Sequence, residues 1–161
     1  MLRTASWAVR IGCTVHLIHH NVYELTETYG ESMLPTINYA GDFVHVDKTC
    51  RFGDRCTLGD VIIAVKPTDA GQRVCKRIVG MPGDFVQIDP TTQPASYLQV
   101  PQGHVWVTGD NLTKSLDSRS YGPLPMALIK GRVIAVNSLN DFQWIKNGMR
   151  NEDRLVVDPK N

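Results

Sequence analysis

The chain has 161 residues, which suits one folded domain with short additions and excludes two large domains. Its 17 basic and 16 acidic side chains leave a formal charge of +1, so it lacks the strong positive field that non-specific nucleic-acid binding requires. With 42% apolar and 20% charged residues, the composition predicts a folded body and excludes a largely disordered chain.

Residues 1–28 form the first predicted unit, an N-terminal helix for targeting or membrane anchoring. The chain has no acidic residue before Glu24, whereas Arg3 and Arg10 are basic, a bias typical of mitochondrial targeting segments. Helical spacing places five apolar residues on one stripe, so the helix is amphipathic. The members of that stripe are Trp7, Ile11, Val15, Ile18 and Val22.

The most apolar window of this helix, residues 7–23, is interrupted by one arginine and three histidines. It is therefore less apolar than the roughly 20 residues of an isolated membrane span, and composition alone favours a helix that lies on a membrane. The histidines, His16, His19 and His20, have a spacing that could face a metal ion. No nearby carboxylate or thiolate completes such a site, so we predict no metal.

Residues 29–161 form the second predicted unit, a mainly β body. Short β-branched runs alternate with Gly and Pro turns such as Gly41-Asp42 and Gly59-Asp60, and no long helical period appears. The tail from residue 137 to 161 is less patterned and receives no role. The predicted strands cover residues 43–47, 61–66, 73–79, 85–89, 104–108 and 131–137.

The four cysteines, at positions 13, 50, 56 and 75, include no Cys-x-x-Cys pair. Neither a zinc cluster nor a dense disulfide framework is indicated, and we expect free thiols.

Several familiar catalytic patterns are missing. Outside the N-terminal segment only His45 and His104 could serve as the base of a Ser-His-Asp triad. There is no Gly-x-Ser-x-Gly elbow, no Ser-x-x-Lys pair and no phosphate-binding glycine loop. The sequence therefore calls for no cofactor.

Lys76 is an unusual lysine because strand alternation places it on the same face as Val74 and Ile78. An ammonium group on an apolar face is desolvated, which lowers its pKa and makes it a candidate general base. The alternative is that Lys76 extends from a half-buried edge strand to water, as lysines commonly do. Alternation alone leaves both interpretations open.

Four runs of sequence, taken together, resemble the successive conserved boxes of type I signal peptidases. They are GESMLPT at residues 30–36, GDFV at 41–44, CKRIVGMPGD at 75–84 and GDNLTKSLDSR at 109–119. The run VPQGHVWVTGDN at 100–111 and the YGPLP turn at 121–125 resemble the mitochondrial branch of that family, fungal members in particular. The likeness covers roughly residues 15–146, and it implies a coiled, barrel-like antiparallel β-sheet with an N-terminal helix.

The resemblance implies a serine endopeptidase in which Ser32 is the nucleophile and Lys76 its base. It implies further that Ser115 hydrogen-bonds and orients the lysine. In bacterial relatives a hydroxyl two residues before the nucleophile often helps to bind the oxyanion, but this chain has Gly30 there. Three further groups of residues are implied. Asp117 and Arg119 form an ion pair that supports the site loop, and Gly109, Asp110 and Asn111 form a turn that returns this loop to the nucleophile. Met33 and Pro35 line the substrate cleft.

The resemblance also implies a place and partners for the protein. It predicts cleavage of sorting signals from proteins delivered to the mitochondrial intermembrane space, at the inner membrane, with a related second catalytic subunit and a small accessory subunit. It also predicts that the N-terminal helix anchors the chain by spanning this membrane, where composition alone favours a helix that lies on it. Two alternatives are a non-catalytic assembly subunit of the same protease, which the presence of both Ser32 and Lys76 disfavours, and a bacterial-type secretory leader peptidase, which the acid-free N-terminus disfavours.

Overall fold

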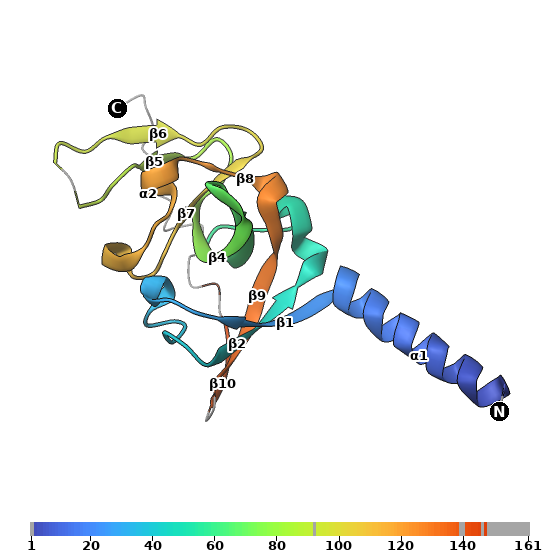
Figure 1. Ribbon diagram of the computed structural model, residues 1–161. Coiled ribbons are helices and arrows are strands. Elements are labelled where there is room, and N and C mark those ends of the chain that lie inside the picture. Colours follow the sequence, from blue (N-terminus) through green and yellow to red (C-terminus); the bar gives the residue numbers. More distant parts are fainter. Residues whose placement is uncertain (1, 92, 139–140, 146, 148–161) are drawn as a thin grey trace.

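The computed structural model describes residues 2–91, 93–138, 141–145 and 147. A long helix, α1 (Leu2–Asn21), projects from a body of antiparallel strands joined by loops and short helices (Figure 1). This confirms the predicted fold class, a mainly β protein with an N-terminal helix. The strands are β1 (Tyr23–Thr28), β2 (Asp42–Asp47), β3 (Val61–Lys66), β4 (Asp69–Gly80), β5 (Phe85–Gln87), β6 (Tyr97–Gln99), β7 (His104–Thr108), β8 (Leu124–Pro125), β9 (Ile129–Ser138) and β10 (Asp141–Trp144).

The main sheet has the strand order β1-β2-β9-β3-β4-β7-β8, and β10 pairs with β9 beside it. Strands β5 and β6 form a separate two-stranded sheet. Short helical turns occupy the connections, and they hold several candidate site residues. They are η1 (Glu31–Met33), η2 (Lys48–Gly53), η3 (Leu112–Lys114), α2 (Ser118–Tyr121) and η4 (Met126–Leu128).

The body has a hydrophobic cluster on each face of the central strands. In β3 the side chains of Val61 and Ile63 enter one cluster, and those of Ile62 and Ala64 enter the other. All four are buried, which is why this strand is apolar at every position from 61 to 65 instead of alternating with polar residues. The two clusters fix β3 and its neighbour β4, and β4 carries Lys76.

All six predicted strands are present, although β4 is longer than predicted and β5 ends at Gln87. Four further strands, β1, β6, β8 and β10, were not predicted. The largest difference concerns residues 23–28, which the prediction placed in the N-terminal helix. The helix ends at Asn21, and Tyr23–Thr28 pairs with β2 along its whole length.

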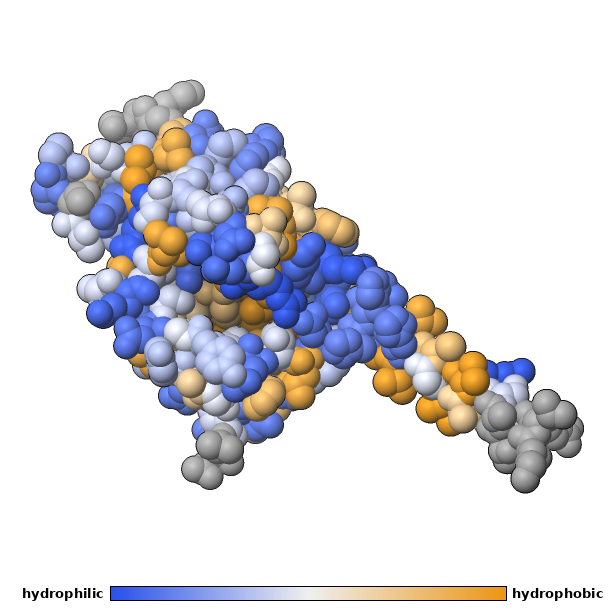
Figure 2. Space-filling view, in the orientation of Figure 1, coloured by the Kyte–Doolittle hydropathy of each residue, from blue (hydrophilic) through white to orange (hydrophobic). Residues whose placement is uncertain are grey.

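Helix α1 is joined to the body at its C-terminal end. The amine of Lys48 donates to the carbonyl of His19 at 3.3 Å, and the Lys48 amide donates to the carbonyl of Val22 at 2.8 Å. Apolar side chains of the helix, Trp7 and Val15 among them, are exposed. Figure 2 shows hydrophobic surface along the projecting helix. In the part of the chain that the structure describes, no helix is both long and apolar enough to cross a membrane.

Candidate active site

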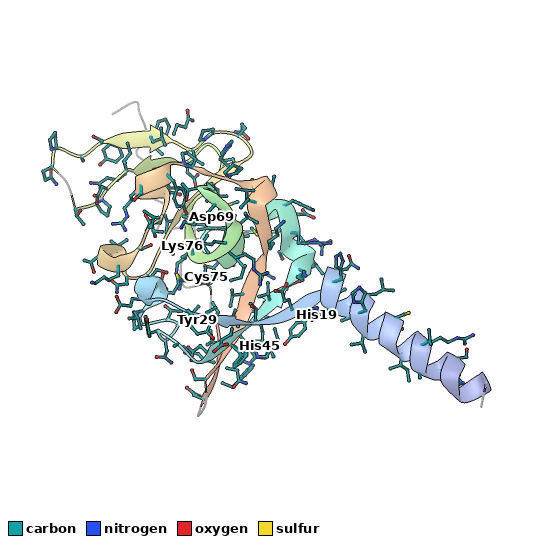
Figure 3. All side chains as sticks on the ribbon, viewed as in Figure 1. His19, Tyr29, His45, Asp69, Cys75 and Lys76 are labelled. Atoms are coloured by element: carbon teal, nitrogen blue, oxygen red, sulfur yellow. The ribbon has the colours of Figure 1, made fainter. Side chains whose placement is uncertain are left out.

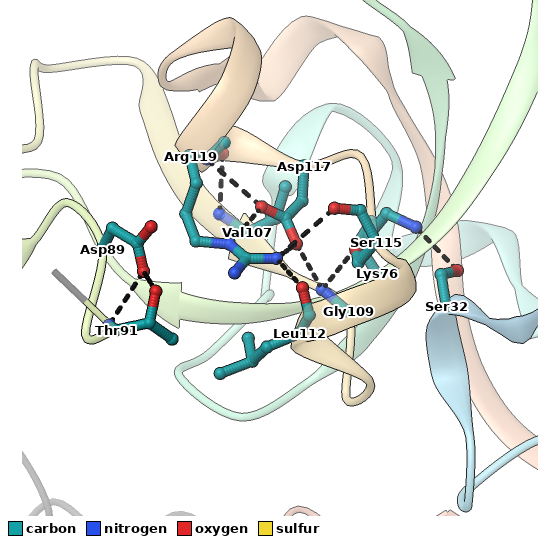
Figure 4. A network of polar contacts seen from close by, with 11 residues as sticks. Ser32, Lys76, Asp89, Thr91, Val107, Gly109, Leu112, Ser115, Asp117 and Arg119 are labelled. Carbon is teal, nitrogen blue, oxygen red and sulfur yellow. Dashed lines mark hydrogen bonds and ion pairs between the residues drawn. The ribbon is translucent and has the colours of Figure 1, made fainter.

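Ser32 and Lys76 meet although 44 positions separate them in the chain. The Lys76 amine donates a hydrogen bond to the Ser32 hydroxyl, with 2.8 Å between Nζ and Oγ (Figure 4). Ser32 lies in the short turn η1, whereas Lys76 lies in the middle of β4, a strand held by β3 along most of its length. A serine hydroxyl and an amine at this distance can exchange a proton.

The environment of Lys76 favours the neutral amine. The side chain is only 4% exposed, so it does not extend to water as the alternative interpretation required. Burial is the main influence and lowers the pKa of Lys76 from its ordinary value; Cys75, Asp117 and Asp110 act in the opposite direction without cancelling it. None of the ion pairs among the described residues includes Lys76.

The loop around Ser32 begins at Gly30, whose φ of 114° favours glycine over other residues. Ser32 shares a cavity of about 110 Å³ with Met33, Lys76 and residues of β1 and β4. Pro35 was predicted to line the same cleft, but it lines a different pocket that includes Asp42 and residues of β9 and β10. The peptide chain turns between Met33 and Pro35, so the two side chains face different spaces.

The loop of residues 109–119 packs against Ser32. The Asn111 amide donates to the Ser32 carbonyl at 3.0 Å. A Cβ atom at Gly109 would meet that same carbonyl and the Ser115 side chain, so only glycine fits there without displacement. The structure thus places the Gly109-Asp110-Asn111 turn directly beside the candidate nucleophile.

Ser115 has hydrogen-bond partners that differ from the expected one. Its hydroxyl accepts from the Gly109 amide at 3.1 Å and bonds to Asp117, whose pKa it helps to lower. No hydrogen bond between Ser115 and Lys76 is present among the described residues. The geometry instead makes Ser115 a support for the Gly109 backbone, because its hydroxyl bonds to the Gly109 amide and to Asp117.

Asp117 and Arg119 form a close ion pair, with 2.9 Å between Nε and Oδ1 (Figure 4). Asp117 is fully buried, and it also accepts from the Gly109 amide at 3.0 Å. Burial alone would raise the pKa of Asp117, but hydrogen bonds from Arg119, Ser115 and the Gly109 amide outweigh burial and lower it. The carboxylate therefore stays ionised and links α2 to the Gly109 turn.

A second ion pair, which the sequence reasoning did not identify, holds the other side of the site. Arg77, adjacent to Lys76, makes two hydrogen bonds to Asp110 at 2.8 and 2.7 Å. The Thr36 hydroxyl donates to the same carboxylate at 2.5 Å. One cluster thus joins β4, the Gly109 turn and the loop that follows Ser32. Strand alternation in the sequence could have indicated part of this arrangement, because it places the Arg77 side chain on the face of β4 opposite Lys76.

The cavity at Ser32 lies between two strands with free edges. Among the described residues, β1 pairs only with β2, and β4 pairs with β7 only from Arg77 onward. The cavity is lined by residues 28–30, 32, 33 and 37 and by residues 73–76. Of this lining, Tyr29, Cys75 and Lys76 are labelled in Figure 3. An extended peptide can therefore reach the Ser32 hydroxyl along unpaired backbone groups.

Comparison with known proteins identifies the family of this chain. Residues 1–92 and 89–137 match the family described as signal peptidase, peptidase S26. The chain therefore belongs to this family.

Individual relatives give a narrower comparison. The chain is 46% identical over 170 residues to mitochondrial inner membrane protease subunit 1 of Saccharomyces cerevisiae, with 90% of each chain covered. It is 49% identical over 136 residues to the protein of the same name from Schizosaccharomyces pombe, with 84% of this chain and 86% of the relative covered. A crystal structure of a signal peptidase I from Enterococcus faecalis V583 matches with 25% identity and a TM-score of 0.42, over 48% of this chain and 96% of that chain.

Proposed function

We propose that this protein is a serine endopeptidase in which Ser32 is the nucleophile and Lys76 is the general base. The observation that carries the proposal is the 2.8 Å contact between the Ser32 hydroxyl and a lysine amine that is only 4% exposed. Membership of the signal peptidase family supports the same chemistry.

In the acylation step, the neutral Lys76 amine takes the proton of the Ser32 hydroxyl as Oγ attacks the carbonyl carbon of the scissile peptide bond. The tetrahedral intermediate then collapses, and the C–N bond breaks. Lys76 gives its proton to the departing nitrogen, which leaves as a free amine. The N-terminal part of the substrate remains as an ester on Ser32.

In the deacylation step, Lys76 takes a proton from a water molecule that attacks the ester. The proton then passes to Ser32 Oγ as the ester bond breaks, and a carboxylic acid is released. The base and the nucleophile return to their starting states, so the cycle needs no external reductant, oxidant or cofactor.

The negative charge on the intermediate's oxygen needs hydrogen-bond donors. We assign the backbone N–H of Ser32 to this role, because amides in the first turn of a short helix have no partner within the helix. Gly30 has no hydroxyl to serve as a second donor. The support that Gly109 and Asn111 give to the Ser32 backbone is therefore more important here, since it fixes the donor that remains.

The substrate is proposed to bind as an extended strand between the free edges of β1 and β4. Main-chain hydrogen bonds supply affinity in this mode, and pockets for alternate side chains supply selectivity. The small cavity beside Ser32, with Met33 and Cys75 in its lining, would hold a side chain next to the scissile bond.

In the cell, we propose that the protein acts at the mitochondrial inner membrane, where it removes sorting signals from proteins delivered to the intermembrane space. The names of the two fungal relatives support this location, and the word subunit in those names supports work within a complex. The proposed partners are a related second catalytic subunit and a small accessory subunit. In this proposal residues 1–28 target or anchor the chain, and the catalytic domain, residues 29–161, faces the intermembrane space.

The test is processing of a sorting-signal precursor by the purified full-length chain and by its Ser32→Ala and Lys76→Met variants. Each variant is expected to lose activity by about 10³-fold or more, because each removes a group that takes part in bond making or proton transfer. Lys66→Met, which changes a partly exposed lysine on β3 whose amine bonds to Gln72, is the matched control. Near wild-type turnover by either active-site variant would refute the assignment of Ser32 as nucleophile and Lys76 as base.

The same assay separates the alternative functions. A wild-type chain that cleaves mitochondrial sorting signals but not bacterial secretory leaders supports the proposed role, and the reverse preference supports a leader peptidase. A chain that binds its partner subunits but cleaves neither substrate, even in the assembled complex, would be the non-catalytic subunit.

A further inference from the structure

An ion pair bridges the two strands on either side of the candidate cleft. Arg73 on β4 donates from Nη2 to Glu24 on β1 at 2.7 Å, and from the same nitrogen to the Thr26 hydroxyl at 3.3 Å. Strands β1 and β4 lie at separate positions in the sheet order and have no backbone pairing with each other. The Arg73 side chain therefore links β1 and β4 beside the cavity that holds Ser32.

The bridge lies at a defined distance from the reacting groups. Arg73 precedes Lys76 by three residues on the same strand, and a strand rises by about 3.3 Å per residue, so the two Cα atoms are about 10 Å apart. Arg73 lines the same cavity as Ser32 and Lys76. A peptide that lies along β4 with its scissile bond at Ser32 therefore places a residue about three positions away beside Arg73.

The bridge carries a net positive charge. Glu24 also accepts from Lys48 at 3.0 Å, so one carboxylate faces two cations. Burial raises the pKa of Glu24, but the hydrogen bonds from Arg73 and Lys48 outweigh it and lower the pKa, which keeps this carboxylate ionised. Two positive groups and one negative group leave +1 at this end of the cleft.

Arg73 also has capacity to bind another group. A guanidinium has five N–H donors, and both of the hydrogen bonds described for Arg73 use Nη2. Its side chain is 41% exposed, whereas the Glu24 side chain is 14% exposed. The cation is therefore the member of the pair that a peptide in the cleft can reach, and the carboxylate lies behind it.

We propose that Arg73 is a specificity-determining residue that favours an acidic side chain about three residues from the scissile bond and disfavours lysine or arginine there. The inference rests on the proposed peptidase function and adds a substrate preference to it. A carboxylate on the substrate gains a partner at Arg73, whereas a substrate cation meets a net positive site. Because Arg73 is partly exposed, solvent screens both effects and the expected selectivity is moderate.

The test uses the full-length chain and fluorogenic peptides that differ at one position. Glu, Gln or Lys is placed singly at two, three or four residues from the scissile bond, on each side of it. The wild-type chain is expected to show a kcat/KM ratio of Glu to Lys peptide of about 5 at one position near the third residue. The Gln peptide is expected to fall between the two.

Two variants should move this ratio in opposite directions. Arg73→Gln is expected to bring the Glu to Lys ratio to about 1, because it removes the cation. Glu24→Gln is expected to raise the ratio above the wild-type value, because it removes the carboxylate that partly neutralises Arg73. A purely structural bridge would lower the cleavage of all peptides in both variants and leave the ratio unchanged.

The controls separate this inference from damage to the fold and from the proposed function. Arg55→Gln removes an exposed arginine that does not line the cavity, so the ratio should stay at the wild-type value. Arg73→Lys keeps the charge and should keep the direction of the preference. A ratio near 1 in the wild-type chain at all positions, or an unchanged ratio in Arg73→Gln, overturns the inference alone. Failure of the wild-type chain to cleave any of the peptides contradicts the proposed function, and the inference falls with it.

Discussion

The α-carbon of Gly109 packs so closely against the backbone carbonyl of Ser32 that no side chain fits between them. A Cβ atom at position 109 would meet this carbonyl and the Ser115 side chain. The neighbouring Asn111 amide bonds to the same carbonyl at 3.0 Å. The loop that carries Ser115 and Asp117 therefore holds the backbone of the nucleophile, and the position of Ser32 depends on residues far away in the chain.

Gly109→Ala is expected to displace this loop from Ser32. The added methyl group meets backbone and short side-chain atoms that cannot move freely, so we expect a destabilisation of about 1–3 kcal/mol and a large loss of peptidase activity. Urea unfolding and peptide cleavage measure the two effects. Gly12→Ala in α1 is the matched control, because a Cβ atom there meets nothing within 4 Å. Equal behaviour of the two variants would show that the tight contact has no role.

The rate of cleavage should depend on pH through Lys76. The amine must be neutral to accept the serine proton, so kcat/KM is expected to rise with pH through the pKa of Lys76 and then to level off. Because burial lowers that pKa, the midpoint should lie below 10.5, the ordinary value. Initial rates between pH 5 and pH 10 measure it. A profile that follows a free lysine amine, with its midpoint at 10.5, would contradict a lowered pKa for Lys76 in the folded protein.

Lys76→Met should abolish cleavage but stabilise the fold at neutral pH. The folded protein releases the Lys76 proton at a lower pH than the unfolded chain does, so between the two pKa values the unfolded state binds more protons and stability rises with pH. The cost of burying this lysine is therefore fully present below the folded pKa and disappears above 10.5. Replacement by an apolar side chain of similar length should raise the free energy of unfolding by about 1 kcal/mol at neutral pH.

Urea titrations of wild type and Lys76→Met at several pH values measure this difference. It should shrink as the pH approaches 10.5, while Lys66→Met shows no such trend. A variant less stable than wild type at pH 7 would mean that the contact with Ser32 contributes more to stability than burial of the amine costs.

Asp110→Ala is expected to destabilise the site more than the loss of a surface charge does. It leaves the Arg77 guanidinium, which is largely buried, without its carboxylate and removes the acceptor of the Thr36 hydroxyl. We expect a cost of about 3 kcal/mol in the free energy of unfolding, measured by urea denaturation. The double variant Asp110→Ala with Arg77→Met should be less destabilised than Asp110→Ala alone, because it leaves no uncompensated charge. A larger loss in the double variant would contradict this explanation.

The sequence predicts best those strands that are buried on both faces or made of β-branched residues. The strands at 61–66 and 104–108 are of this kind, and burial rewards the residues that form them. Strand β1 was missed because its residues YELTET are mostly polar and follow a helix without a glycine or proline between them. It is an edge strand, and its conformation comes from pairing with β2, a long-range contact that local patterns do not contain.

In the candidate site, too, local patterns predict the local features of a strand but not its long-range contacts. Alternation along β4 correctly places Lys76 on the face of Val74 and Ile78, a local property of the strand. Its contact with Ser32 depends on how the sheet curls, so alternation could not supply it and only the family resemblance did. The partners of Ser115 depend on the conformation of its loop, which places the Ser115 hydroxyl against the Gly109 amide and Asp117. Neither local pattern nor resemblance resolves such a choice.

Helix α1 contributes no residue to the hydrogen bonds around Ser32, Lys76 and Asp117, or to the cavity that they share, among the described side chains. It meets the body at one end, through contacts of Lys48 with His19 and Val22. In the proposed function, the segment that targets or anchors the chain and the residues that cleave the substrate are thus physically separate. We therefore expect a chimaera with a foreign helix fused before Tyr23 to keep the same peptidase activity in a new compartment.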